Sequence, residues 1–417
     1  MSVTLDILEI GARGDGIAEL DGKRLFVPFT LPAETVEAEP RDERGDGVAC
    51  DLLEVLTPSR HREAAPCAHF GVCGGCALQH WRRDIYTDWK VDLIRRALQQ
   101  RGVKAPPFMP PLAGEPTERR RADIVLRRQG GEVLAGFHER ASQKVVDVGT
   151  CIVARPAINA ALAPLRLAMV DVLSDGAAAD AILNETDGGL DVLLRPHKHL
   201  TLSQQLQERL VALAEQANFA RLSWGDRARA EPVVIRRAPS LMLGDVTVEP
   251  PPGVFLQATK RTEVTMRAAV TAWLGDAAHV ADLFAGIGAL TLGRTGRLSL
   301  FESDQPAVTS INTAARKPGG NRVVAHRRDL FRNALTAAEL DMFDGIVLDP
   351  PRAGAAAQCA ELAQSKVKRI VYASCDPGSF ARDVRGLQDA GYRLEKLMPI
   401  DQFLWSAHVE LIALLTK

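Results

Sequence analysis

The stretch D-L-F-A-G-I-G, from Asp282 to Gly288, ends an apolar strand-like run and opens a helical pattern. Gly286 and Gly288 allow the backbone to pass close to a ligand at the carboxyl edge of a sheet. The stretch is not a dinucleotide fingerprint, because Thr291 stands where the third glycine of that fingerprint would be. A tight packing turn is the alternative explanation for two glycines at this spacing.

The chain around this turn, from about residue 251 to the end of the sequence, alternates apolar strand-like runs with helical ones. Continuous apolar strands separated by helices imply a doubly wound, largely parallel sheet. We therefore predict an α/β, Rossmann-like domain over residues 251–417. Its predicted strands are Val280–Phe284, Leu298–Glu302, Val323–His326, Ile346–Leu348, Ile370–Ala373 and Val409–Leu414.

Acidic side chains stand at the ends of the two strands that follow the glycine turn. Glu302 ends the first of them, where it is placed to accept hydrogen bonds from ribose hydroxyls. Asp329 follows the second and is a candidate partner for an adenine amino group, with an ordinary helix N-cap as its alternative role. A cofactor with a nucleoside but no pyrophosphate fits this set, and S-adenosylmethionine is such a molecule.

Two further motifs follow later strands of the same sheet. In L-D-P-P-R-A-G, two prolines hold Asp349 at the sheet's edge, either beside the cofactor or simply within a rigid turn. In S-C-D-P, Cys375 directly follows an apolar strand, where a thiol is a candidate nucleophile. The alternative for a lone cysteine is a small buried hydrophobe, which is the role that we assign to Cys50 and Cys359.

One carboxylate interrupts the apolar strand H-V-E-L-I-A-L-L near the end of the sequence. Glu410 is either an edge residue or a partly buried base with a raised pKa. Without the other motifs, the edge position is the simpler explanation.

The seven cysteines are an odd number in a chain without an export signal, which favours a metal or catalytic use of thiols over a disulfide framework. Cys67, Cys73 and Cys76 follow a C-x5-C-x2-C spacing, and Cys151 lies far along the chain. Zinc prefers two C-x2-C pairs, whereas three close thiols and one distant thiol suit an iron–sulfur cluster. We expect a structural iron–sulfur cluster here, with zinc as the alternative.

Two more domains are predicted before residue 251. Residues 1–60 read as short strands broken by glycine turns, which suggests a small β-barrel. Residues 61–250 hold the cysteine loop, a helix over residues 84–101, a proline-rich linker, and a compact α/β or α+β domain. We expect the helix over residues 84–101 to pack on the C-terminal domain.

Composition and charge narrow the class of protein. With 46% hydrophobic and 25% charged residues, the 417-residue chain resembles an ordinary soluble globular protein. No run approaches 18 apolar residues and no secretory signal opens the sequence, so we expect a cytoplasmic protein without a membrane span. The formal net charge is −1, but residues 61–155 carry 16 Lys and Arg against 10 Asp and Glu, while residues 1–60 carry 6 against 13. The run Arg119–Arg121, with Arg127 and Arg128, is either a phosphate-binding cluster or a solvated basic face.

Taken together, five separated motifs in the right order resemble the RNA (uracil-5)-methyltransferase family over nearly the whole chain. The resemblance implies an OB-like TRAM barrel at the N-terminus, Cys375 as the nucleophile and Glu410 as the base. It implies S-adenosylmethionine as cofactor, contacted by Gln257, Phe284, Gly286, Gly288, Glu302, Asp329 and Asp349. It also implies a four-iron, four-sulfur (4Fe-4S) cluster on Cys67, Cys73, Cys76 and Cys151.

The likeness is closest to the members that modify 23S ribosomal RNA, because the tRNA-modifying branch typically lacks both the barrel and the cluster. In this chemistry, the Cys375 thiolate adds to the sixth carbon of uracil, which lets the fifth carbon accept a methyl group. Glu410 then removes the remaining proton from the fifth carbon. The expected partner is an RNA with a single-stranded or flipped uridine, not DNA or a membrane. Because the N-terminal module is acidic, we expect the RNA contact in the basic middle segment.

Three alternatives stay open at this point. The first is a tRNA uracil-5 methyltransferase. The second is an amino-methyltransferase that acts on DNA or RNA through D-P-P-R, a chemistry that needs no thiol and favours an aromatic residue where Arg352 stands. The third is a non-enzymatic iron–sulfur RNA-binding or assembly protein, which would have no affinity for S-adenosylmethionine.

Overall fold

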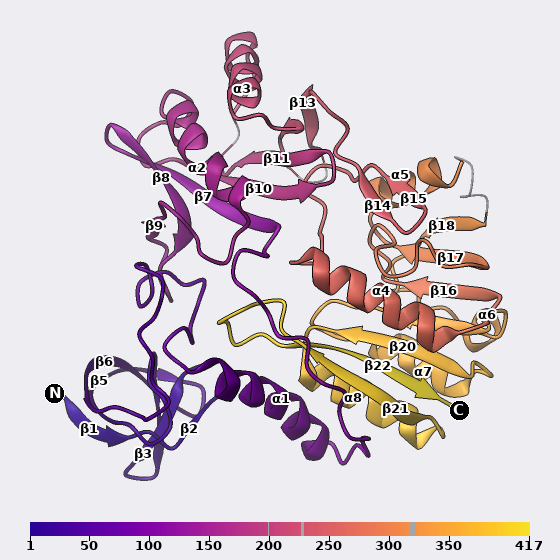
Figure 1. Cartoon of the computed structure of the whole chain (residues 1–417), viewed down its shortest axis with the longest axis horizontal. Coiled ribbons are helices and arrows are strands. Elements are labelled where there is room, and N and C mark those ends of the chain that lie inside the picture. The colour runs from indigo at the N-terminus through magenta and orange to yellow at the C-terminus, as the bar shows by residue number, and fades with distance from the viewer. Residues whose placement is uncertain (199, 227–228, 317–321) are drawn as a thin grey trace.

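The computed structural model of the chain describes residues 1–198, 200–226, 229–316 and 322–417. Within these ranges the strands form a six-stranded sheet, two seven-stranded sheets and a two-stranded sheet. The chain runs from the six-stranded sheet through the first seven-stranded sheet to the second (Figure 1). None of the helices in the described ranges has the length and the apolar character that crossing a bilayer requires.

The N-terminal strands form one sheet that does not close into a barrel. They are β1 (Val3–Asp6), β2 (Glu9–Ile10), β3 (Gly16–Leu20), β4 (Lys23–Val27), β5 (Thr35–Arg44) and β6 (Gly47–Thr57). The order β1-β5-β6-β4-β3-β2 leaves β1 and β2 at the two edges, without a β1–β2 pairing in the described part of the chain. The two residues of β2 already pair with β3, so few backbone groups are left to close the sheet. The predicted OB-like barrel is therefore corrected to an open sheet.

The central sheet has the order β13-β12-β11-β10-β7-β8-β9 and is antiparallel except where β11 meets β12. Its interior side packs on two helices, whose apolar residues share one core with the strands. A buried ion pair between Arg221 and Asp191 ties β12 to β11. The elements are β7 (Arg121–Gln129), β8 (Glu132–His138), β9 (Val145–Asp147), α2 (Pro156–Met169), β10 (Ala178–Thr186), β11 (Gly189–Pro196), α3 (Gln204–Gln216), β12 (Arg221–Trp224) and β13 (Glu231–Ile235). The hairpin of β14 (Leu241–Leu243) and β15 (Val246–Val248) leads on to the C-terminal part.

The C-terminal part contains the predicted doubly wound sheet, and the six predicted strands are all present. Its elements are α4 (Lys260–Leu274), β16 (His279–Leu283), β17 (Arg297–Glu302), α5 (Gln305–Ala315), β18 (Val323–Arg327), α6 (Ala337–Leu340), β19 (Gly345–Leu348), α7 (Ala356–Gln364), β20 (Arg369–Ser374), α8 (Pro377–Asp389), β21 (Arg393–Ile400) and β22 (Glu410–Thr416). The order is β18-β17-β16-β19-β20-β22-β21, with parallel pairing from β18 to β20. The sequence analysis missed β21, because three charged residues in its first four positions hide its apolar end.

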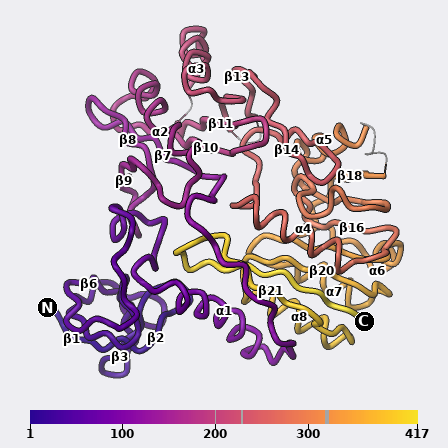
Figure 2. Tube along the Cα trace, viewed as in Figure 1, coloured from indigo at the N-terminus to yellow at the C-terminus, as the bar shows by residue number. Residues whose placement is uncertain are grey.

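The last strand runs against its neighbours. β22 pairs antiparallel with β20, and Ser374 at the end of β20 lies opposite Leu411 at the start of β22. The start of β22 therefore lies at the same edge of the sheet as the carboxyl ends of the parallel strands. The loop between β21 and β22 extends from this edge toward the segment near residue 80 (Figure 2). There the backbone N–H groups of Ala77 and Leu78 donate to the carbonyl oxygen of Trp405, at 2.8 and 3.0 Å.

The helix α1 (Arg83–Gln100) joins the N-terminal sheet to the C-terminal one. It packs against α8 and β21, and the indole N–H of Trp89 donates to the carbonyl oxygen of Ile10 in β2 at 3.2 Å. Its buried Lys90 ammonium donates to the Asp401 carboxylate at 2.5 Å and to the carbonyl oxygen of Phe403 at 3.0 Å. Burial lowers the pKa of Lys90, whereas Asp401 opposes that change. This ion pair anchors the start of the β21–β22 loop to α1.

We expect Lys90→Met to lower the free energy of unfolding by about 3–5 kcal/mol, because it leaves the buried carboxylate of Asp401 without its cation. Urea denaturation followed by tryptophan fluorescence measures this change, since Trp89 and Trp405 pack in one cluster with Tyr86, and the Lys90 ammonium lies over the Tyr86 ring. The matched control is Arg95→Met on the same helix, which breaks an exposed pair with Asp92 and costs about 0–1 kcal/mol. Equal losses in the two variants would contradict the structural role of Lys90.

Candidate active site and cysteine pocket

A cavity of about 580 Å³ opens at the carboxyl edge of the C-terminal sheet. It lies where β17 and β19 flank β16 on opposite sides, the position at which doubly wound sheets bind ligands. All but one of the predicted cofactor and catalytic residues line it. These are Gln257, Phe284, Gly286, Glu302, Asp329, Asp349, Cys375 and Glu410.

The glycine turn forms one wall of this cavity. The Gly286 N–H donates to one Glu302 carboxylate oxygen at 2.9 Å, and the Asp304 N–H donates to the other at 2.8 Å. These two bonds fix the carboxylate at the end of β17. Gly288, with φ at +78°, does not line the cavity, and a β-carbon there would lie within 2.9 Å of Leu292 and Leu300. Gly288 therefore allows the tight turn and the close packing of Leu292 and Leu300 against it.

An aromatic pair stands at the mouth of the cavity. The rings of Phe284 and Phe331 lie 5.2 Å apart, and about half of Phe331 is exposed to solvent. Asp329, two residues before Phe331, accepts the Phe331 N–H at 3.0 Å. The pair and the carboxylates of Glu302 and Asp329 together give this end of the cavity an aromatic wall and hydrogen-bond acceptors.

The partly buried carboxyl group of Asp349 and the buried one of Glu410 lie at the other end. Burial raises the pKa of Asp349 to about 7 and that of Glu410 to about 8. For Glu410, the hydrogen bond from Gln402 opposes the rise, and the charge of Asp349 adds to it. The Gln257 amide donates to Asp349 at 3.3 Å, and Gln402 donates to both Gln257 and Glu410.

Cys375 lies directly after β20 and shares the cavity with Glu410. Burial raises the pKa of its thiol to about 12, and the nearby charges of Glu410 and Asp349 act in the same direction. The Arg352 guanidinium opposes this rise. Its ion pair with Asp376 at 3.5 Å keeps the arginine beside the thiol.

Sequence reasoning missed Phe331 and Gln402 in this site, and it missed the effect of Arg352. Gln402 is 3% exposed and follows the end of β21, the strand that the sequence analysis did not find. A polar pair after a strand, Asp401 and Gln402, is the kind of signal that singled out Asp349. Arg352 was noted as part of D-P-P-R, but nothing in the sequence indicates its effect on Cys375.

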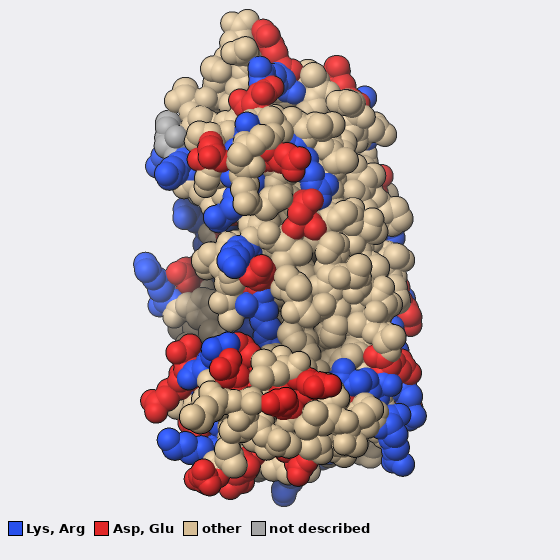
Figure 3. Space-filling view, turned by 90° about the vertical axis from the view of Figure 1, so that its left-hand side faces the viewer, with Lys and Arg blue, Asp and Glu red and all other residues tan. Residues whose placement is uncertain are grey.

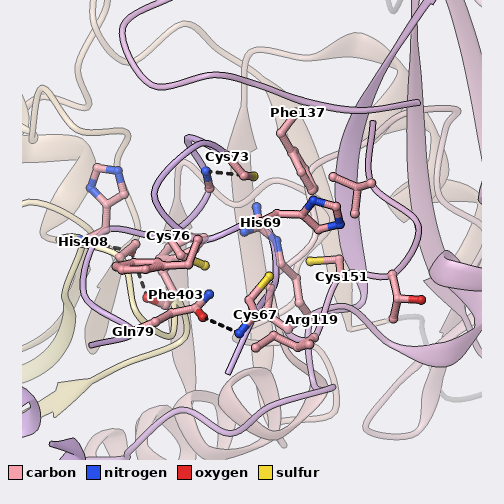
Figure 4. A pocket seen from close by; sticks show the side chains of 17 residues that line it. Cys67, His69, Cys73, Cys76, Gln79, Arg119, Phe137, Cys151, Phe403 and His408 are labelled. Carbon is pink, nitrogen blue, oxygen red and sulfur yellow. Dashed lines mark hydrogen bonds between the residues drawn. The ribbon is translucent and has the colours of Figure 1, made fainter. Parts of the chain in front are cut away.

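The four predicted metal-binding cysteines meet at a second cavity of about 270 Å³. Figure 4 shows Cys67, Cys73, Cys76 and Cys151 around one space, with Phe403 and His408 on one side. No group of three or more His, Cys, Asp or Glu side chains in the described ranges is arranged to hold a metal ion. Cys50 and Cys359, which the sequence analysis predicts to be buried, are in the core as expected.

The two cavities share a wall. Phe403 and His408, both in the β21–β22 loop, line the cysteine cavity and the larger cavity alike. The loop therefore lies between the cysteines on one side and Cys375 and Glu410 on the other.

The basic run Arg119–Arg121 is not a uniform solvated face. Arg120 is buried, forms an ion pair with Glu263, and donates to the carbonyl oxygen of Gln257 at 3.1 Å. Its role is to hold the Gln257 segment rather than to bind a phosphate. Arg119 lies over the ring of Phe403 at 5.8 Å and lines the cysteine cavity. On the face in Figure 3, Lys and Arg side chains gather beside a hollow, whereas basic and acidic side chains are mixed toward the bottom.

Comparisons with known proteins show what the chain is similar to. A family model described as tRNA (Uracil-5-)-methyltransferase matches residues 321–417. An RNA methyltransferase of Rhizobium meliloti is 40% identical over 426 residues, which cover 100% of this chain and 99% of that protein. The 23S rRNA (uracil(1939)-C(5))-methyltransferase RlmD of Chromohalobacter salexigens is 31% identical over 99% of this chain and 89% of that protein. The crystal structure of Pyrococcus abyssi tRNA (uracil-54, C5)-methyltransferase with S-adenosyl-L-homocysteine has the same fold, with a TM-score of 0.76, 22% identity and 99% of both chains covered.

The environment of Cys375 predicts that its thiol reacts slowly with alkylating reagents in the ligand-free protein. We expect the rate of alkylation by iodoacetamide to keep rising above pH 9, because an ordinary thiol has largely ionised by then whereas this one has not. Arg352→Gln should slow alkylation further at each pH, since the guanidinium favours the thiolate. Mass spectrometry of the peptide that contains Cys375 measures the rate. A profile that levels off near pH 8.5 would contradict the raised pKa.

Proposed function

The chain belongs to the RNA (uracil-5)-methyltransferase family, and we propose that it forms 5-methyluridine in 23S ribosomal RNA with S-adenosylmethionine as the methyl donor. The observation that carries the proposal is the shared cavity of Cys375 and Glu410, a thiol and a carboxyl group at one sheet edge. The choice of 23S rRNA rests on the 31% identity to RlmD along 99% of the chain. The tRNA enzyme of Pyrococcus abyssi, at 22% identity, supports the fold alone.

The residues of the larger cavity fit S-adenosylmethionine. Its ribose hydroxyls would donate to Glu302, whose position the Gly286 and Asp304 N–H groups already fix. Its adenine would contact the rings of Phe284 and Phe331, with the amino group near Asp329. When bound, the molecule supplies a methyl group on a positively charged sulfur. Gln257 and the partly buried Asp349 lie at the far end, where a positive charge would be stabilised.

Cys375 begins the reaction on the RNA base. Its sulfur forms a bond to the sixth carbon of uracil, and the electron pair of the ring double bond moves onto the enolate, which makes the fifth carbon nucleophilic. The thiol must first lose its proton. Arg352 and a positively charged ligand beside Asp349 both favour the thiolate that this step requires.

Glu410 completes the reaction. After the fifth carbon has gained the methyl group, the Glu410 carboxylate takes the remaining proton from that carbon. The freed electron pair restores the ring double bond, and the bond to Cys375 breaks so that the thiolate leaves. A uracil that reaches both groups must be out of its base stack, in a loop or flipped.

The four cysteines fit the proposed 4Fe-4S cluster by their chemistry. Burial raises the pKa of Cys73, and that of Cys76 to about 12, so thiolates here need a positive centre beside them. A single zinc ion would need sulfurs about 2.3 Å away, and the described residues offer no set of side chains so arranged. An iron–sulfur cluster binds each cysteine at a different iron, which suits thiols spread around a cavity.

The proposal also covers the domain organisation of the chain and its location in the cell. We assign residues 1–60 to a TRAM-like module, residues 61–250 to the cluster domain and residues 251–417 to the methyltransferase domain. The protein would act on RNA in the cytoplasm.

Mapping of methylated uridines by mass spectrometry, in ribosomal and transfer RNA from a deletion strain, identifies the target. Loss of a methyl group from tRNA with 23S rRNA unchanged would overturn the choice of substrate.

Variants at the two reacting groups separate their roles. Cys375→Ala should abolish methylation, because no bond to the base can form. Glu410→Gln should form the bond and transfer the methyl group, then accumulate a denaturant-resistant RNA–protein complex. The control is Cys359→Ala, which changes a buried thiol outside the site. Full activity of Cys375→Ala would rule out the addition mechanism.

Cluster content is measured directly. Purified without oxygen, the protein should contain about four irons and four sulfides per chain, with the visible absorbance of a cluster. Cys151→Ser should lose both, whereas Cys359→Ser should keep both. Stoichiometric zinc, or no metal in freshly isolated protein, would overturn the cluster.

A further inference from the structure

Gln402 is a buried amide between the carboxyl groups of Asp349 and Glu410. Its Nε2 donates to the Gln257 Oε1 at 2.8 Å and also to the Glu410 carboxylate. Its Oε1 accepts the backbone N–H of Ala258 at 2.8 Å. Both protons of the amide nitrogen are therefore used, and the side chain is 3% exposed.

The orientation of this amide follows from one backbone group. An amide oxygen must face the Ala258 N–H, because a nitrogen there would place two donors together. The Gln402 nitrogen must then face Glu410 and Gln257. Since Gln257 receives that proton on its oxygen, its own nitrogen faces Asp349, to which it donates at 3.3 Å. The Ala258 N–H thus fixes the orientation of both amides. Their nitrogens donate along a chain of hydrogen bonds that ends on Glu410 at one side and on Asp349 at the other.

We propose that Gln402 is a positioning residue that aims the Glu410 carboxylate at the uracil and keeps it ready to accept a proton. The inference rests on the proposed function and extends it to a residue that is not among those lining the cavity. Because the same amide also donates to Gln257, the methyl-donor site and the base share one hydrogen-bonded support.

The groups that face Glu410 make this support necessary. Asp349 after β19 and Asp401 after β21 disfavour a charge on Glu410, and a charged Glu410 in turn disfavours the thiolate of Cys375 after β20. Lys90 on α1 and the hydrogen bond from Gln402 act in the opposite direction and favour the ionised Glu410. A hydrogen bond from Gln402 stabilises the ionised carboxylate, which is the form that takes the proton. In the step concerned, that proton moves from the fifth carbon to Glu410, its electron pair restores the double bond, and the bond from the sixth carbon to sulfur breaks.

The test measures the formation and the decay of the covalent RNA–protein complex separately. Gln402→Glu keeps the length and the acceptor for Ala258 but replaces the donor beside Glu410 with another carboxyl group. Gln402→Met removes the donor without adding charge. Both should form the complex and should release it at least roughly tenfold more slowly, since a hydrogen bond to a charged group is lost. The pH at which release is half-maximal should rise by about one unit or more.

The matched control is Gln358→Met, which removes another buried glutamine held by backbone groups, here those of Leu335 outside the site. It should release the complex at the wild-type rate and pH. The proposal is overturned when either Gln402 variant releases the complex as the wild type does, or when formation and release slow equally. Failure of the proposed function is distinct, because wild-type protein and Glu410→Gln would then form no complex at all.

Discussion

The antiparallel pairing of β22 with β20 is the constraint on which this active site depends. It sets Ser374 opposite Leu411, and so brings Glu410, the first residue of β22, to the edge where β20 delivers Cys375. In a wholly parallel sheet the first residue of the last strand would lie at the opposite edge, roughly 20 Å away for a strand of six residues. One reversal of direction therefore brings the proposed nucleophile and the proposed base together at one edge of the sheet. Glu410 is buried by the same pairing, because β20 and β21 flank β22 on its two sides.

The loop that precedes β22 connects this edge to the rest of the chain. Lys90 on α1 holds its start through Asp401, and the Cys76 segment holds its middle through the carbonyl oxygen of Trp405. Phe403 and His408 then face both the cysteine cavity and the larger cavity. Arg120 gives the Gln257 segment an equivalent anchor from the central domain. Residues far apart in the sequence thus support one short stretch, which gives the proposed cluster a structural purpose without an electron-transfer step.

The features that the sequence could predict are those that depend on local patterns of residues. The glycine turn, the apolar strands and the polar residues directly after them identify the sheet edge, because strand ends of a parallel sheet meet there. The role of Gln402 could not be predicted, since it depends on Ala258 and Gln257, which lie almost 150 residues earlier. The burial of Arg120 was hidden within a basic run that reads as exposed. The open N-terminal sheet was missed because short alternating strands do not reveal which edges pair.

The central claim is that Cys375 forms a bond to the same uracil that receives the methyl group. The most direct measurement incubates the wild-type protein and S-adenosylmethionine with target RNA that carries 5-fluorouridine, and then analyses the digested complex by mass spectrometry. Fluorine cannot leave as a cation, so the base has no proton to remove and the product stays attached. We expect a peptide in which Cys375 carries a methylated fluorouridine. An unmodified Cys375 peptide, or attachment at another residue, would contradict it.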